Sequence, residues 1–156
     1  MAIKPVYLTS EGKQKLEEEL DQLRTVGRSE VAEAIRSAKE EGDLKENSAY
    51  DEAKQAQGFL EGRIQTLEAQ LLNAVIIEKN GDGGVVSFLS EVTVLEDGED
   101  EKETYKIVGA AEASPLDGLI SNESPIGEAL LGKKKGDKVT VETPGGELTL
   151  KIVKVA

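Results

Sequence analysis

The chain of 156 residues contains no cysteine, no histidine and no tryptophan, and aromatic residues make up only 3% of it. These absences exclude disulfide bonds, zinc sites built from Cys and His, and catalysis that uses a Cys nucleophile or an imidazole base. Any metal site must therefore be built from oxygen ligands, which favours Mg²⁺ or Ca²⁺. Carboxylates, lysines, tyrosines and hydroxyl groups remain as candidate catalytic groups.

A surplus of positive charge is also lacking, because 19 basic residues face 31 acidic ones and the net charge is −12. Strong binding of free DNA or RNA is not expected, since neutralising phosphates needs clustered Lys and Arg. A basic protein surface is the partner that this charge favours. The longest apolar run, Ala74–Ile77, is too short to span a membrane, and the start lacks the apolar run of a signal peptide. We therefore expect a cytoplasmic protein without membrane contact.

Proline is absent between Pro5 and Pro115, and apolar positions over residues 9–77 follow helical spacing. Two stripes step by three or four residues: Leu16, Leu20, Leu23, Gly27, Val31, Ile35 (or Ala34) and Ala38, then Ala49, Ala53, Ala56, Leu60, Ile64, Leu67, Leu71 and Ala74. This spacing is typical of two helices packed along a common seam. Gly27 is a candidate for a kink in the first helix.

A short stretch, Gly42-Asp43-Leu44-Lys45-Glu46-Asn47-Ser48, separates the two helices and predicts the tip of an antiparallel hairpin. Asp43 and Glu46 have the spacing of a capping box, with Asp43 as the N-cap and Glu46 at the third helical position. The same pair can present carboxylates to Mg²⁺. Two carboxylates form only half of such a site, because Mg²⁺ usually needs phosphate or further ligands. The two interpretations are compatible, since a cap can hold the carboxylates in place.

The second half of the chain has a different pattern, which predicts a compact α+β domain. Alternating apolar residues predict strands over residues 85–95, 104–108, 138–142 and 147–155. A short helix is predicted with Ser124 as cap, Pro125 in its first turn and Gly132 at its end. The predicted domains are a helical hairpin over 1–77 with an acidic tip at 42–48, a polar linker over 78–84, and a globular domain over 85–156.

Several separated motifs along the whole chain occur together in one known family. They are Tyr7-Leu8-Thr9 with Glu11-Gly12, residues 42–50 of the tip, Ala53-Lys54, residues 57–64, Tyr105 to Gly109, Ser124 to Gly127 with Leu130 to Gly132, and Thr143 to Gly146. In this order they closely resemble the bacterial Gre transcript-cleavage factors, most of all GreA. A lone Asp-x-x-Glu would not be specific.

The resemblance implies a long antiparallel coiled-coil hairpin followed by a small FKBP-like α+β domain. Such factors bind bacterial RNA polymerase stalled after backtracking; the globular domain docks at the rim of the secondary channel and the hairpin enters it. The tip acids, here Asp43 and Glu46, help to hold a Mg²⁺ ion shared with the polymerase and orient the attacking water. The polymerase then cuts the backtracked RNA near its 3′ end. The factor is an accessory without enzymatic activity of its own, and we expect a monomer.

The resemblance also implies further contacts. The candidates for contact with the backtracked RNA are Lys39, Lys54 and, more weakly, Arg36, and those for docking to the polymerase are Ser124, Pro125 and Ile126. Alternatively, the candidates for RNA contact are ordinary solvated charges on a helix. The candidates for docking would alternatively belong to a short buried helix with no partner contact.

Two other functions remain open. A Gre-fold protein can occupy the channel and inhibit the polymerase without cleavage, although the sparse acidic tip favours cleavage. A helical adaptor whose tip acids only cap a helix is the other, and Asp43→Asn would then change little because Asn also caps well. A Mg²⁺ nuclease acting alone is disfavoured, since no further ligand clusters with Asp43 and Glu46.

Overall fold

The computed structural model describes residues 4–42, 46–79 and 84–156. The chain divides into two compact units, a hairpin unit over Glu11–Ala74 and a globular unit that combines Lys4–Ser10 with Val75–Ala156. The sequence prediction placed the boundary after residue 77 and counted the first residues with the hairpin. The division by contacts differs there, because a short strand near the start of the chain pairs with the segment that follows the hairpin.

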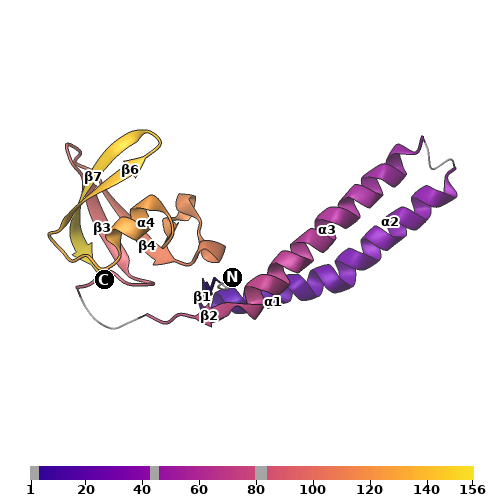
Figure 1. The fold of residues 1–156 in the computed structure, drawn as a ribbon, viewed down its shortest axis with the longest axis horizontal. Helices are drawn as coiled ribbons and strands as arrows, with labels where there is room; N and C mark the ends of the chain where they lie inside the picture. Colours follow the sequence, from indigo (N-terminus) through magenta and orange to yellow (C-terminus); the bar gives the residue numbers. More distant parts are fainter. Residues whose placement is uncertain (1–3, 43–45, 80–83) are drawn as a thin grey trace. The chain divides into compact units, whose positions relative to one another are not determined.

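Four helical segments form the two arms of the hairpin (Figure 1): α1 (Ser10–Gln22), the π-helical turn η1 (Leu23–Gly27), α2 (Arg28–Glu40) and α3 (Ser48–Leu72). The π turn lies where a kink was predicted, and the Arg28 N–H bonds to the Leu23 carbonyl across it. A Cβ on Gly27 would lie 3.0 Å from Leu60 Cδ1. The arms therefore approach closely at this turn.

The predicted seam is confirmed in the middle of the hairpin, where Leu20, Leu60, Ile64 and Leu67 form a buried cluster. Small residues continue it toward the tip, with Ala38 at 3% and Ala53 at 6% exposure. The prediction is wrong at Ala49 and Ala56, because both are exposed. At the latter, the half-buried Gln57 takes the inward position of that turn.

Ion pairs between the arms flank this seam. Arg28 donates to both carboxylate oxygens of Glu61 at 2.9 and 3.0 Å, and Arg63 does the same to Glu19. These hydrogen bonds lower the pKa of each glutamate below its usual value. Such exposed pairs contribute little stability individually, but their bidentate geometry helps to align the two arms.

The predicted helix through residue 77 is wrong beyond Leu72. Asn73 ends α3, with its Nδ2 donating to the Ala69 carbonyl at 3.0 Å. The next residues form β2 (Ala74–Ile76), which pairs with β1 (Val6–Leu8). The apolar run that suggested helix therefore continues as strand, because a pairing partner is available from the start of the chain.

The globular unit contains a five-stranded sheet in the order β5-β4-β3-β7-β6 (Figure 1). Only β4 and β5 are parallel. Its elements are β3 (Glu91–Glu96), β4 (Lys102–Val108), the 3₁₀ turns η2 (Ala110–Glu112) and η3 (Pro115–Asp117), β5 (Leu119–Ser121), α4 (Pro125–Leu130), β6 (Lys138–Thr143) and β7 (Gly146–Val155). Together with the helical hairpin, this sheet confirms the α+β class.

Three of the four predicted strands are confirmed, but the strand predicted over 85–95 is wrong before Glu91. Val85 makes only an isolated bridge to Lys134, and Leu89 has a positive φ of 67° that breaks the extended run. The core is formed by the inward faces of the sheet and by α4, with Val92, Ile107 and Leu130 essentially inaccessible to solvent. Among the described residues, no helix combines the length and the apolar character needed to cross a membrane.

Candidate functional site

The tip of the hairpin joins the end of α2 to the start of α3. Glu41 caps α2 with its N–H bonded to the Ala38 carbonyl at 3.3 Å, and Gly42 follows with a φ of +141° that favours glycine. Asp43, the first predicted catalytic acid, lies outside the described residues. Glu46, the second, is exposed and lies in a bend before α3.

The predicted capping box is wrong, because the N-cap of α3 is Asn47. Its Oδ1 accepts a hydrogen bond from the Tyr50 N–H at 3.1 Å. Glu46 therefore precedes the cap and does not occupy the third helical position. The cap on the Tyr50 N–H therefore does not use the carboxylate of Glu46, since the amide oxygen of Asn47 accepts from that N–H.

The same asparagine also reaches the other arm. Its Nδ2 donates to the Ala38 carbonyl at 2.7 Å, and this bond is partly buried. The carbonyl belongs to the last turn of α2, where helix carbonyls lack partners within their own helix. One side chain thus links the end of one arm to the start of the other.

An open hollow of about 440 Å³ lies at the tip and is lined by Glu41, Glu46, Asn47, Ser48 and Ala49. Carboxylate oxygens are suitable ligands for Mg²⁺. Within residues 4–42, 46–79 and 84–156, however, no three acidic groups gather closely enough to hold a metal ion. The donor chemistry therefore fits Mg²⁺, but only with ligands from elsewhere.

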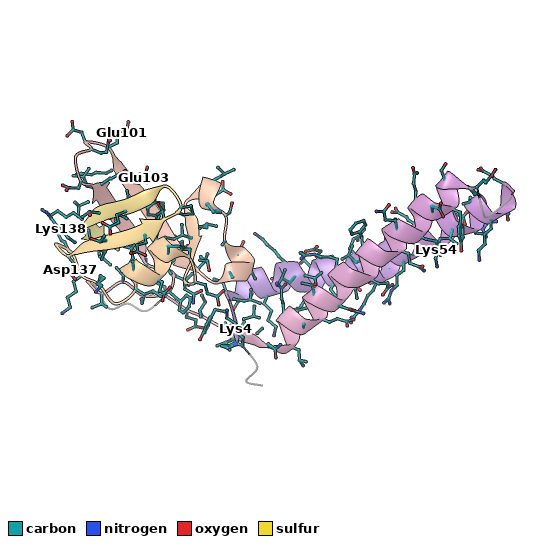
Figure 2. All side chains as sticks on the ribbon, turned by 45° about the horizontal axis from the view of Figure 1, so that its top comes forward. Lys4, Lys54, Glu101, Glu103, Asp137 and Lys138 are labelled. Atoms are coloured by element: carbon teal, nitrogen blue, oxygen red, sulfur yellow. The ribbon has the colours of Figure 1, made fainter. Side chains whose placement is uncertain are left out.

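The predicted RNA-contacting residues are all exposed on the arms. Arg36 is already engaged, since it pairs with Glu33 and with Glu40, the latter at 2.7 Å. Lys54 lies on α3 (Figure 2), and its Nζ donates to the Gln57 side chain at 2.9 Å. Among described residues, neither Lys39 nor Lys54 has an ion-pair partner within 4.0 Å. The ammonium groups of the two lysines are therefore free of carboxylates in the described part of the chain, whereas the charged guanidinium of Arg36 is already paired with two of them.

The predicted docking residues lie at the start of α4 in the globular unit. Ser124 is the N-cap: its Oγ accepts from the Gly127 N–H at 3.1 Å and donates to the Ser121 carbonyl at 2.7 Å. Pro125 is exposed, whereas Ile126 is half-buried and packs against the core. Of the three, Pro125 is the side chain most available to a partner, and the predicted cap is confirmed.

Models of one protein family match almost the whole chain. The N-terminal domain of GreA/GreB transcription elongation factors matches residues 6–76, and the C-terminal domain of the same factors matches residues 80–156. The chain belongs to the GreA/GreB family of transcription elongation factors. Curated GreA proteins of Bacillus velezensis and Bacillus subtilis are each 54% identical to it over 157 aligned residues, which cover 100% of both chains. GreA of Thermoanaerobacter pseudethanolicus is 56% identical, covering 97% of this chain and 98% of its own.

Solved structures are similar as well. GreA factor homolog 1 of Thermus thermophilus is 33% identical and aligns over 98% of this chain and 99% of its own, with a TM-score of 0.45.

For this GreA/GreB chain, sequence reasoning found the acidic tip but missed Asn47. The available signal was weak, because Asp43, Asn47 and Ser48 are all good N-cap residues. Choosing among them required the position of the Ala38 carbonyl on the other arm, which is a tertiary property.

Proposed function

We propose that this chain binds backtracked bacterial RNA polymerase and stimulates Mg²⁺-dependent cleavage of the RNA near its 3′ end. The observation that carries the proposal is the exposed carboxylate of Glu46 at the end of the hairpin. This acid has no capping role, because Asn47 caps α3. A carboxylate that is not needed for the fold, at the end of a long projection, is suited to a site completed by a partner.

The dimensions of the hairpin support insertion into a channel. The α3 helix has 25 residues, so it extends about 37 Å at 1.5 Å per residue. The small residues Ala38 and Ala53 are buried near the tip, which keeps the arms close together there. The hairpin would enter the secondary channel of the polymerase and bring Glu46 to the reacting RNA.

Asp43 and Glu46 would hold Mg²⁺ together with carboxylates of the polymerase. When bound, the ion stabilises negative charge on the phosphodiester and makes a bound water more acidic. The carboxylates of this chain would orient that water by accepting its hydrogen bonds. Since most ligands come from the polymerase, this chain would act as an accessory factor and would not hold the ion tightly by itself.

The contacts outside the tip are proposals too. The net charge of −12 favours docking on a basic protein surface over binding of free nucleic acid. The start of α4, with Ser124, Pro125 and Ile126, is proposed to dock at the channel rim. Lys39 and Lys54 are proposed to contact the backtracked RNA, with the chain acting as a cytoplasmic monomer.

The decisive experiment measures cleavage of end-labelled RNA in a backtracked bacterial elongation complex with Mg²⁺. Wild type is compared with Asp43→Asn and Glu46→Gln, and Glu52→Gln on the exposed side of α3 is the matched control. We expect short 3′ fragments with wild type and with the control. Both tip variants should lower the cleavage rate about 100-fold or more while binding persists.

Retained cleavage in both tip variants would refute the role of the acids. Binding by wild type without any cleavage would instead favour a factor that blocks the channel.

A second assay tests the lysines. Replacing Lys39 and Lys54 by Gln should weaken RNA-dependent binding to the complex. It should also flatten the dependence of log affinity on log salt by about 0.7 for each lost phosphate contact. An unchanged dependence of log affinity on log salt would mean that Lys39 and Lys54 are ordinary solvated charges on the helices.

A further inference from the structure

Glu46 is adjacent to the residue that joins the two arms, but its own carboxylate is unsupported. In the described part of the chain, no hydrogen bond or ion pair holds that carboxylate. Asn47, in contrast, is held on both sides, by the Ala38 carbonyl and by the Tyr50 N–H. Consecutive Cα atoms are about 3.8 Å apart, so the backbone from which Glu46 projects is anchored one residue away.

We propose that Asn47 is a positioning residue, whose two hydrogen bonds aim the carboxylate of Glu46 by fixing the backbone beside it to both arms. The inference rests on the proposed function, in which Glu46 serves the cleavage reaction. Asn47 itself is not assigned any contact with RNA, metal or water.

Both bonds are needed for this role, and only an amide of this length supplies them together. The cap bond alone ties Asn47 to α3 and makes no direct link to α2. The second bond, at 2.7 Å to the Ala38 carbonyl, supplies that link. Ala38 is itself fixed in the seam, where it is only 3% exposed. The tip backbone is therefore held to the packed part of the hairpin.

The two bonds can be separated by substitution. Asn47→Ser keeps an N-cap oxygen, because Ser caps about as well as Asn, but it is too short to bridge to α2. Asn47→Ala removes both bonds. The matched control is Asn73→Ser at the other end of α3, where the side-chain amide also donates to a backbone carbonyl but stays within its own arm.

The test uses the full chain in the backtracked elongation complex and measures the maximal cleavage rate separately from the factor concentration at half-maximal rate. We expect Asn47→Ser to lower the maximal rate about 10- to 100-fold, since a small displacement of a catalytic group has effects of that size. The half-maximal concentration should stay within twofold of wild type. Asn73→Ser should match wild type in both quantities.

Amide hydrogen exchange of the free protein supplies a readout independent of activity. The Tyr50 N–H should exchange faster in Asn47→Ala and remain protected in Asn47→Ser. This result would show that Asn47→Ser retains the cap, so that a lowered maximal rate in this variant cannot come from loss of the cap.

The following outcomes would overturn the positioning role of Asn47. A wild-type maximal rate in Asn47→Ser would overturn the positioning role while leaving the proposed function intact. A changed half-maximal concentration with an unchanged maximal rate would also overturn it, because that pattern indicates weaker docking. If wild type does not stimulate cleavage, the proposed function fails and the inference fails with it.

Discussion

The start of α4 rests on a contact that leaves no room for a side chain. A Cβ on Gly127 would lie 2.0 Å from the carbonyl oxygen of Ser121 and 2.9 Å from its carbonyl carbon. The optimal separation of non-bonded heavy atoms is about 3.5 Å, so Gly127→Ala requires the Ser121 carbonyl and the α4 backbone to move apart by about 1 Å or more. Both partners are backbone, which cannot rotate away. The substitution must therefore move α4 away from β5.

The magnitude follows from two opposing effects. Alanine is favoured over glycine in a helix by about 1 kcal/mol. Overpacking costs about 1–3 kcal/mol, and we expect the upper value at Gly127 because the Ser121 atoms that the new Cβ would meet belong to the backbone. The net effect is a loss of about 2 kcal/mol from the globular unit. For a unit of this size the unfolding midpoint should fall by about 8–16 °C.

The matched controls are Gly58→Ala and Gly62→Ala in α3, because a Cβ at either position meets nothing within 4 Å. These variants should be about 0.5–1 kcal/mol more stable than wild type in the hairpin unit. The assay is amide hydrogen exchange in the full chain, read at β4 for the globular unit and at α3 for the hairpin. Unchanged protection of β4 in Gly127→Ala, or equal losses in the α3 controls, would refute the steric reasoning.

Three further predictions concern stability and ionisation. Leu67→Ala, at a fully buried seam position, should destabilise the hairpin by about 2–5 kcal/mol in urea unfolding followed by helical circular dichroism, and a loss below 1 kcal/mol would contradict the packing. Hydrogen bonds from Arg63 lower the pKa of Glu19 in the folded state, so their contribution is present above the unfolded pKa near 4.3 and is lost as pH falls through the folded value. Acid titration should therefore destabilise wild type more than Glu19→Gln below about pH 4.3, and parallel curves would exclude this linkage. Burial, with a smaller effect of the Glu103 carboxylate on β4 (Figure 2), raises the pKa of Tyr105 to about 12. Ultraviolet titration, with Tyr105→Phe as the blank, should show ionisation near that pH, and Glu103→Gln should lower it only in part; a midpoint near 10 in wild type would be incompatible with this burial.

Local pattern was sufficient for much of the fold. Helical spacing identified the middle of the hairpin seam, since Leu60, Ile64 and Leu67 are buried as their three- and four-residue steps predict. Alternation identified β6 and β7, and the Ser-Pro pair identified the start of α4. These features depend on residues close together in the chain, where one periodicity or one cap decides the outcome.

The functional tip shows the limit of such reasoning. The sequence by itself determined that a polar, acidic turn joins two helices, because the apolar stripes stop on either side of residues 42–48. It did not determine which residue caps α3, since several good caps compete within one turn. In the tertiary structure Asn47 is the cap, and its amide gains a second hydrogen bond to the Ala38 carbonyl on the other arm.

The same division holds for the remaining differences between prediction and structure. The apolar run after α3 becomes strand β2 only because β1, far away in the chain, supplies its pairing partner. Gly127 needs to be glycine only because the Ser121 carbonyl lies against it. The sequence alone therefore determined the periodic elements and the acidic character of the tip. Contacts between distant segments decided the rest, because a hydrogen bond or a close approach between two segments depends on where both of them lie.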